Sequence, residues 1–182
     1  MYARSYADVG VAAICDHAKV KKGSFYHFFT SKQELTLAVL DTYYVGYKEN
    51  IIDIAFSSSL KPMERLAMFN KLVIEFQQDI YEQTGHIYGC PFGNLATEMA
   101  TQDEVIRQKI GHLFTLLQQL LRDTLQEAMN SGDIELIDPD ATARAILAYT
   151  EGTMMLAKTH NDPNILQQLL PAGLQVRIPI TN

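Results

Sequence analysis

Apolar residues recur at spacings of three and four along most of the chain, and this period predicts helices almost throughout. The broadest apolar stripe covers residues 62–83, and a longer one covers residues 103–130. A third long helix is expected over residues 139–160, because Asp138 suits the N-cap and Pro139 suits the first turn. No hairpin dipeptide lies between alternating apolar runs, so the sequence predicts an all-α fold.

Shorter helical segments are expected near both ends of the chain and in its middle, at residues 8–18, 23–29, 92–100 and 163–170. Ser31 and Glu34 have the spacing of a capping box, which predicts that a longer helix begins there and runs toward residue 50 or beyond. Pro171 and Pro179 predict an irregular tail, because proline cannot continue a helix or a central strand.

The short helix over residues 23–29 has two different faces. Phe25, Phe28 and Phe29 lie at positions i, i+3 and i+4, so they are expected to pack this helix onto its neighbours. Polar and cationic residues occupy the other sides, namely Lys21, Lys22, Ser24, Tyr26 and His27. Two short helices joined by about four residues, with lysines at the start of the second, match a helix-turn-helix, whose second helix enters the DNA major groove.

The overall charge of −6 argues against a nucleic-acid partner, but the charge is unevenly distributed. Residues 1–48 carry six Lys and Arg against four acidic residues, a balance of +2, whereas the remaining nine bases and 17 acids give −8. The cationic quarter of the chain is therefore the one that contains the helix-turn-helix pattern.

Residues 5–14, 18–29 and 31–35 resemble the DNA-binding domain of TetR-family transcriptional repressors in order, spacing and residue type. The resemblance implies a helix-turn-helix domain over residues 1–48 and a helical effector-binding and dimerisation domain over residues 49–182. It also implies a repressor that is released from a near-palindromic DNA operator by a small-molecule effector of unknown identity. The homodimer would form a four-helix bundle from the helices at about 139–160 and 163–170.

By the same resemblance, the residues that meet DNA would be Lys21, Lys22, Ser24, Tyr26 and His27, with Gly10 and Lys32 on the phosphate backbone. The sequence departs from the family pattern at three places. Gly10 stands where Thr or Ser is more common, and Lys19 replaces a glycine, so a positive φ angle is expected at Lys19. The family's first helix should precede Ser5, and the sequence retains only Met1 to Arg4 of it, so this helix is expected to be largely missing.

The run Gly89-Cys90-Pro91-Phe92-Gly93-Asn94-Leu95 resembles a Gly-Cys-x-x-Gly-Asn-Leu segment at the mouth of the effector domain in a TetR-family subset. A cysteine at a helix start feels the amide dipoles, which favour the thiolate, so Cys90 is a candidate sensor of electrophiles or oxidants. The alternative is a small, half-buried packing residue. The family resemblance also implies an interior effector pocket, for which the candidates are Phe69, Phe76, Cys90, Asn94, Met99, Phe114, Tyr149 and Met155.

Other functions have weaker support. His86 and Cys90 are four residues apart without companion ligands, so neither a metal nor a cofactor is expected. No catalytic motif is present, and the chain is not expected to be an enzyme; the alternative is a ligand-binding or small all-α enzyme domain with a vestigial helix-turn-helix. Apolar runs are far shorter than the ~20 residues of a membrane span, and two cysteines without a CxxC pair suit a reducing compartment, so a cytoplasmic protein is expected.

Overall fold

The computed structural model describes residues 4–180, and within that range the ordered elements are helices, with no strand. Helix α1 covers Val11–Ala18, α2 covers Lys22–Phe28 and α3 covers Lys32–Tyr47. A π-helical turn at Lys48–Ile52 and the short α4 at Asp53–Ala55 continue the path of α3. The prediction of an all-α fold is confirmed. The remnant of a first helix expected at residues 1–4 falls mostly outside the described residues.

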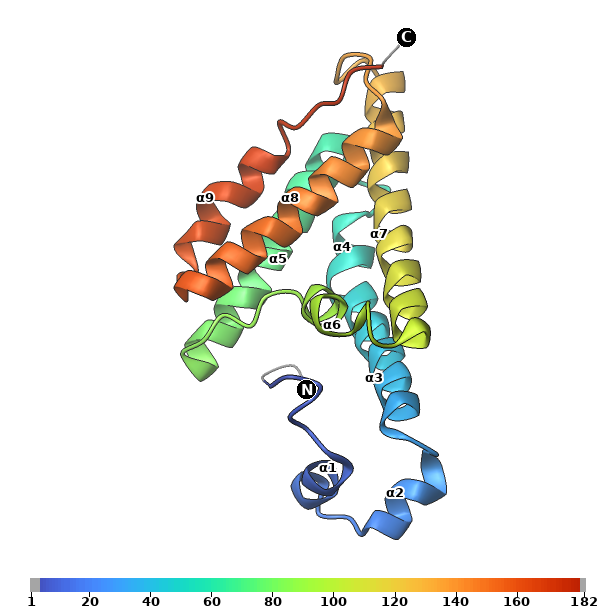
Figure 1. Cartoon of the computed structure of the whole chain (residues 1–182). Coiled ribbons are helices and arrows are strands. Elements are labelled where there is room, and N and C mark those ends of the chain that lie inside the picture. The colour runs from blue at the N-terminus through green and yellow to red at the C-terminus, as the bar shows by residue number, and fades with distance from the viewer. Residues whose placement is uncertain (1–3, 181–182) are drawn as a thin grey trace.

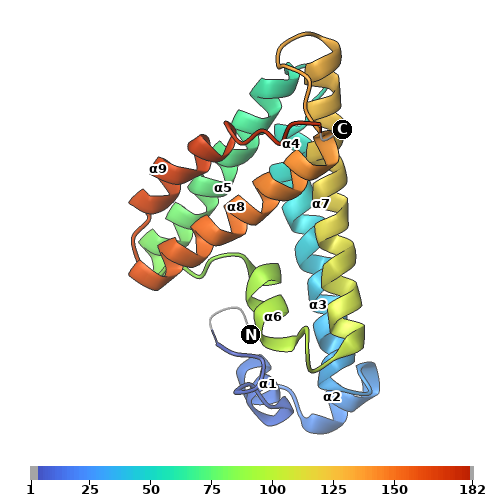
Figure 2. The ribbon, with the colours of Figure 1, turned by 45° about the horizontal axis from the view of Figure 1, so that its top comes forward.

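The rest of the chain forms five helices in the described part: α5 (Pro62–Thr84), α6 (Pro91–Met99), α7 (Glu104–Asn130), α8 (Pro139–His160) and α9 (Asn164–Gly173). Helices α1 and α2 form a small head at one end of the molecule, and α5, α8 and α9 pack together at the other end (Figures 1 and 2). Helices α3 and α7 run side by side between the two ends. The short α6 lies between the head and the α5–α8–α9 group.

Capping residues place most helix starts where the sequence predicts them. The Asp103 carboxylate accepts the amides of Val105 and Ile106 at 3.1 and 3.0 Å, and Asp138 accepts the amide of Ala141 at 2.9 Å. These bonds satisfy amides of the first turn that have no partner within the helix.

Three local predictions need correction. Helix α1 begins at Val11 rather than residue 8, because Gly10 is extended and acts as its N-cap. The Ser31 hydroxyl accepts the Glu34 amide as expected, but the Glu34 carboxylate accepts the amide and hydroxyl of Thr30 at 2.6 and 2.7 Å. The reciprocal bond of the capping box thus lies one residue earlier than predicted.

The end of α9 is the third correction, because the helix continues through Pro171 to Gly173. Pro171 lies in the last turn, so the loss of its amide bond and the clash of its ring with an earlier carbonyl disturb only the end of α9. Close packing holds this turn in place: a Cβ atom built on Gly173 would lie 2.6 Å from the ring of Tyr149 on α8.

A buried apolar cluster joins α6 and α7 to α3, the helix that follows the head. Its members are Leu40, Phe92, Met99, Ile106, Ile110 and Leu113. Two further clusters fill the space among α5, α7, α8 and α9. The domain boundary expected at residue 48 falls at the junction of α3 with the π-helical turn and stays a prediction. Among the described residues, no helix combines the length and apolar character needed to cross a membrane.

Candidate DNA-reading helix and ligand cavity

Helix α2 presents a polar surface at the end of the head. Lys21 is its N-cap residue and Lys22 its first residue, and the side chains of both are exposed. Ser24, Tyr26 and His27 are exposed as well. These five side chains supply cations, hydroxyls and an imidazole to solvent from one short helix, which is the kind of surface that contacts phosphates and base edges.

The aromatic anchor of α2 is smaller than the sequence predicts. Phe25 is 6% exposed, and its ring lies 5.9 Å from that of Phe29. Phe28, in contrast, is 72% exposed and meets only the edge of the His27 ring among the aromatic contacts of the described residues. The expectation that Phe28 packs onto neighbouring helices is wrong: Phe28 is the last residue of α2 and faces solvent, whereas Phe29 leaves the helix in an extended conformation and is half-buried.

Lys19 lies in the turn before α2, and Lys32 lies at the start of the helix after it. Lys19 has φ = 56° and ψ = 38°, which confirms the positive φ expected where lysine replaces glycine. The Lys32 ammonium donates to the carbonyl of Tyr6 at 2.8 Å and lies 3.8 Å from the centre of the Tyr6 ring. Lys32 is therefore engaged within the protein, and Gly10 offers only its backbone at the start of α1.

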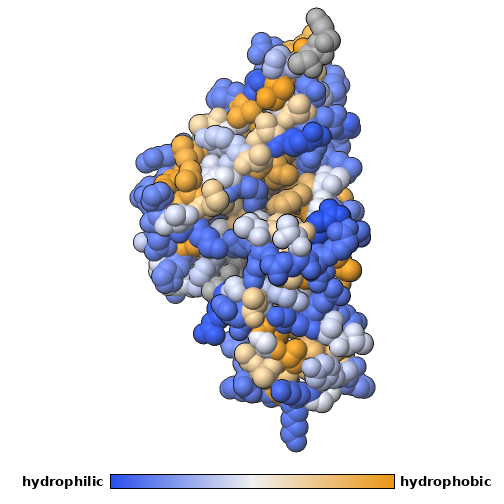
Figure 3. Space-filling view, viewed as in Figure 1, coloured by the Kyte–Doolittle hydropathy of each residue, from blue (hydrophilic) through white to orange (hydrophobic). Residues whose placement is uncertain are grey.

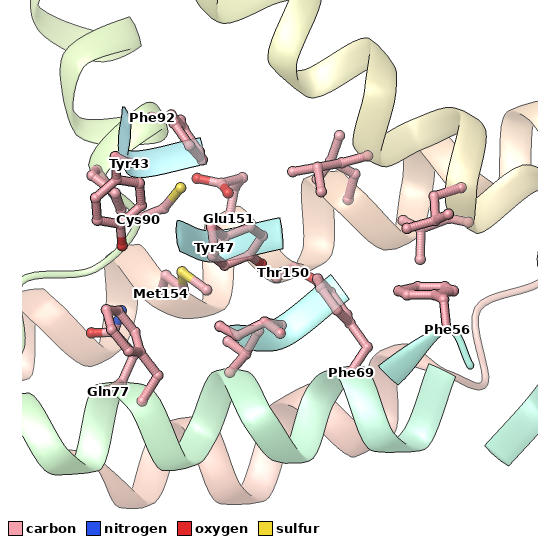
Figure 4. A pocket seen from close by; sticks show the side chains of 18 residues that line it. Tyr43, Tyr47, Phe56, Phe69, Gln77, Cys90, Phe92, Thr150, Glu151 and Met154 are labelled. Atoms are coloured by element: carbon pink, nitrogen blue, oxygen red, sulfur yellow. The ribbon is translucent and has the colours of Figure 1, made fainter. Parts of the chain in front are cut away.

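A small space, here called the inner cavity, lies among α3, α5, α6, α7 and α8 (Figure 4). Its volume of about 30 Å³ is room for a few water molecules, since each needs roughly 10–15 Å³. Most of its wall is aromatic or aliphatic, and it includes Tyr43, Tyr47, Phe69, Phe76 and Phe92. Its polar groups belong to Gln77, Cys90, Thr150 and Glu151 and to the two tyrosines.

A larger open space, here called the outer groove, runs between the N-terminal segment and helices α3, α6 and α8, with a volume of about 1070 Å³. The inner cavity and the outer groove share five wall residues, which form the partition between them: Tyr43, Cys90, Pro91, Glu151 and Met154. Two of the five begin α6, so this helix contributes to both spaces.

The structure brings together some of the pocket candidates and separates others. Phe69, Phe76 and Cys90 line the inner cavity. Cys90, Asn94, Phe114 and Met155 line the outer groove. Met99 lies in the buried cluster of α3, α6 and α7, and Tyr149 packs against Gly173; neither belongs to the walls of these two spaces.

Sequence reasoning missed Glu151, which is the carboxylate of the partition. Its signal in the sequence is that α8 contains no other acidic residue after Asp140, and Glu151 follows the buried Thr150. Figure 4 shows the Glu151 carboxyl between the rings of Tyr47 and Phe92 and beside the Cys90 sulfur. A Cβ atom on Gly93 would lie 2.1 Å from Glu151 Oε2, so a glycine is needed for this approach.

The Cys90 thiol is held in its protonated form. Burial raises its pKa well above the ordinary value, and the nearby Glu151 carboxylate raises it further. The thiol donates to Glu151, while its sulfur accepts the Gly93 amide at 3.4 Å. The expected thiolate is therefore not favoured, because desolvation and the carboxylate outweigh the amides at the start of α6. Burial also raises the pKa of the Glu151 carboxyl.

A polar two-helix head, fixed by a long helix to a helical bundle with a small apolar cavity, has the architecture of a helix-turn-helix DNA-binding protein. Comparison with known families agrees. Residues 1–39 match the model of the bacterial regulatory proteins of the tetR family, and residues 62–172 match the tetracyclin repressor-like C-terminal domain. The chain belongs to the TetR family.

Individual relatives cover nearly the whole chain. The transcriptional regulator AcuR of Cereibacter sphaeroides is 33% identical over 165 residues, which are 90% of this chain and 73% of AcuR. The HTH-type transcriptional repressor DhaR of a Mycobacterium species is 26% identical over 98% of this chain and 86% of DhaR. The crystal structure of the regulatory protein TetR from Rhodobacter sphaeroides superposes with a TM-score of 0.82 at 30% identity, covering 96% of this chain and 91% of that one. The protein is thus a DNA-binding transcriptional repressor of the TetR type, and its relatives are regulators rather than enzymes.

Proposed function

We propose that α2 reads the operator and that its exposed face supplies the contacts: Lys21, Lys22, Ser24, Tyr26 and His27, with Gly10 and Lys32 at the flanking helix starts. The observation that carries this proposal is the exposure of all five α2 side chains in the cationic part of the chain. Lysines bind phosphates in any sequence, and the Tyr26 hydroxyl can reach either a phosphate or a base edge. For Lys32, a phosphate contact requires its ammonium to leave the Tyr6 carbonyl.

The salt dependence of operator binding tests this assignment. Each phosphate contact that is lost reduces the slope of log K against log salt by about 0.9, so Lys21→Ala and Lys22→Ala are each expected to reduce it by roughly one. Lys71→Ala is the control, because Lys71 is an exposed lysine on α5 in the effector half. An unchanged slope in both α2 variants would remove this helix from the operator interface.

We propose further that the inner cavity, extended by the outer groove, binds the effector. Phe69, Phe76 and Cys90 would contact it in the cavity, and Asn94, Phe114 and Met155 are candidates along the groove; Met99 and Tyr149 would act only through packing. No lysine, arginine or histidine belongs to the described wall of the inner cavity, whereas Glu151 does. Burying an anion beside a carboxyl without a cation is unfavourable, so the inner cavity favours a small, uncharged and largely apolar effector. Arg4 and Lys158 line only the outer groove.

A matched trio of probes tests the preference. Benzyl alcohol and benzaldehyde are expected to release operator DNA at lower concentration than benzoate, which has similar size but carries a charge. Release by benzoate at equal or lower concentration would contradict the assignment of an uncharged ligand. Phe69→Ala should weaken release by the neutral probes, because Phe69 forms part of the cavity wall.

The homodimer is proposed to form through α8 and α9, and the repressor to act on DNA in the cytoplasm. Met155 is 63% exposed on α8 and Leu156 is exposed beside it, and Figure 3 shows apolar residues among polar ones on the surface of this part of the molecule. Packing two copies of these helices into a four-helix bundle would cover them. Leu156→Glu should shift sedimentation toward monomer. Leu136→Glu, a change at a 77% exposed loop residue, should leave the dimer intact.

A further inference from the structure

The segment that leads into the reading head is fastened to α6 by one carboxylate. Glu98 Oε2 accepts the Tyr6 amide at 2.7 Å, and Oε1 accepts the Ala7 amide at 2.8 Å. The Ser5 hydroxyl donates to the same side chain. Residues 5–7 lie three residues before α1, so this carboxylate joins the approach to the helix-turn-helix with a helix more than ninety positions later in the sequence.

Lys32 on α3 also holds this N-terminal segment. Its ammonium donates to the Tyr6 carbonyl, and its charge acts on the Glu98 carboxylate. Burial raises the pKa of Glu98, but the amides of Ala7 and Tyr6, the Ser5 hydroxyl and Lys32 together lower it below its ordinary value. Charge-assisted bonds of this kind are about twice as strong as neutral ones, so the segment is held firmly between α3 and α6.

The other end of α6 forms part of the wall of the inner cavity. Cys90 and Pro91 belong to the partition, and α6 is nine residues long, so its two ends are about 13 Å apart. A cavity of about 30 Å³ cannot hold a ligand of several heavy atoms without displacing a wall. The partition is the wall that faces the open groove, and its part from α6 belongs to a short helix, whereas α5 and α8 are long helices that both pack against α7.

We propose that Glu98 is the residue that couples the cavity to the reading head: a ligand that displaces the first turn of α6 moves its far end, and Glu98 carries that movement to Tyr6 and Ala7. The inference rests on the proposed function of the inner cavity. Glu98 belongs to the wall of the outer groove, but it contacts neither the operator-facing side chains nor the inner cavity, so for a ligand in the inner cavity it acts as a positioning residue.

A second tie between the head and the effector half supplies the matched control. Gln33 at the start of α3 donates to Asp103 Oδ2 at 2.7 Å, at the start of α7. This bond does not involve α6, and the other Asp103 oxygen caps α7. Gln33→Ala therefore weakens the link from head to bundle by a route that avoids α6.

The first measurement is amide hydrogen exchange in the full chain. Loss of a charge-assisted bond is worth roughly a factor of ten or more, so Glu98→Gln is expected to accelerate exchange of the Tyr6 and Ala7 amides about tenfold. Gln33→Ala should change these two rates by less than about twofold. Unchanged exchange in Glu98→Gln would overturn the attachment itself.

The second measurement tests coupling without an identified ligand. Val73 lines the inner cavity from α5 and is buried, so Val73→Phe fills the cavity from within; Val73→Leu is the milder replacement if the first does not fold. Operator affinity is measured for wild type, Glu98→Gln and Gln33→Ala, each with and without Val73→Phe, with the helical circular dichroism of every variant confirmed. We expect Val73→Phe to weaken operator binding at least fivefold in wild type and less than twofold in Glu98→Gln.

The outcomes separate the two proposals. Equal weakening by Val73→Phe in both backgrounds would overturn the role of Glu98 while leaving the cavity as the regulatory site. A wild-type protein that binds operator and is unaffected by Val73→Phe or Val73→Leu would contradict the proposed function of the cavity. Loss of coupling in Gln33→Ala as well as in Glu98→Gln would show that any loosening of the head has this effect, and would also overturn the specific role of Glu98.

Discussion

Replacing Gly93 by alanine tests the central contact of the partition between cavity and groove. Gly93 lies inside α6, where alanine ordinarily stabilises a helix by about 1 kcal/mol over glycine. Here the added Cβ would lie 2.1 Å from Glu151 Oε2 and 3.3 Å from its Cδ. The carboxyl group must therefore move away from the start of α6, and it then loses the hydrogen bond from the Cys90 thiol.

The size of the effect follows from two opposing terms. A hydrogen bond to a charged group contributes about 1.5–3 kcal/mol, and the helix propensity of alanine offsets about 1 kcal/mol of its loss. Gly93→Ala is thus expected to lower the free energy of unfolding by about 0.5–2 kcal/mol. Gly111→Ala on α7 is the matched control, because a Cβ at Gly111 would meet no atom within 4 Å, and it should gain up to about 1 kcal/mol.

Urea unfolding at fixed protein concentration measures both variants, since the apparent stability of a dimer depends on concentration. In a Glu151→Ala background, adding Gly93→Ala should no longer lower the free energy of unfolding, because the collision with the carboxyl group is then absent. If Gly93→Ala stabilises the protein as much as Gly111→Ala does, the carboxyl group does not occupy this position and the described partition is wrong.

Three further predictions concern the head and the thiol. Phe25→Ala should destabilise the protein by about 3–5 kcal/mol, whereas Phe28→Ala should stay within about 0.5 kcal/mol, both measured by urea unfolding; comparable losses would refute the assignment of the anchor to Phe25. Lys19→Gly should raise the free energy of unfolding by about 0.5–1 kcal/mol by relieving the left-handed backbone, and a loss would show that the strain is absent. Alkylation of Cys90 by iodoacetamide, followed on its peptide by mass spectrometry, should be slow at neutral pH and accelerate only above pH 9.0, with Glu151→Gln shifting the profile to lower pH. Because the folded pKa of Cys90 is the higher one, its contribution to stability is complete below the unfolded pKa and is lost as the pH rises through the folded value; a stability that is flat from pH 8 to 10 relative to Cys90→Ser would contradict this.

Most of the fold could be predicted from the sequence because its signals are local. The capping aspartates Asp103 and Asp138, with Pro139 next to the second, fix the starts of α7 and α8 within one residue of the expected positions. Local signals failed where the structure depends on which side of a helix packs against another helix. The period of α2 shows that Phe28 lies near Phe25, but it does not show which side of the stripe meets another helix, and Phe28 faces solvent.

The candidate functional residues were likewise predictable only where they are close together in the sequence. The polar face of α2 could be predicted because its residues are consecutive and its exposure follows from a single short helix. The inner cavity draws its walls from α3, α5, α6, α7 and α8, so the sequence shows which residues are apolar without showing which of them border a space. Phe69 and Phe76 border it, whereas Met99 is buried among other side chains. Glu151 was missed because its partners, Cys90 and Gly93, are about sixty residues away.

The distribution of charge makes operator binding sensitive to the position of the head. On the proposed assignment of α2 to the operator, few cations remain for phosphates: Lys32 is engaged by Tyr6, and Lys48 is paired with Asp53 at 2.5 Å. Beyond residue 48 the chain carries a net charge of −8, which repels DNA everywhere except at the head. Affinity then depends on how well two copies of α2 fit successive major grooves, with half-sites roughly 34–36 Å apart or a multiple of it. A complex held by so few phosphate contacts is sensitive to small displacements of the head, and the bonds from Glu98 to Tyr6 and Ala7 lie where such a displacement would begin.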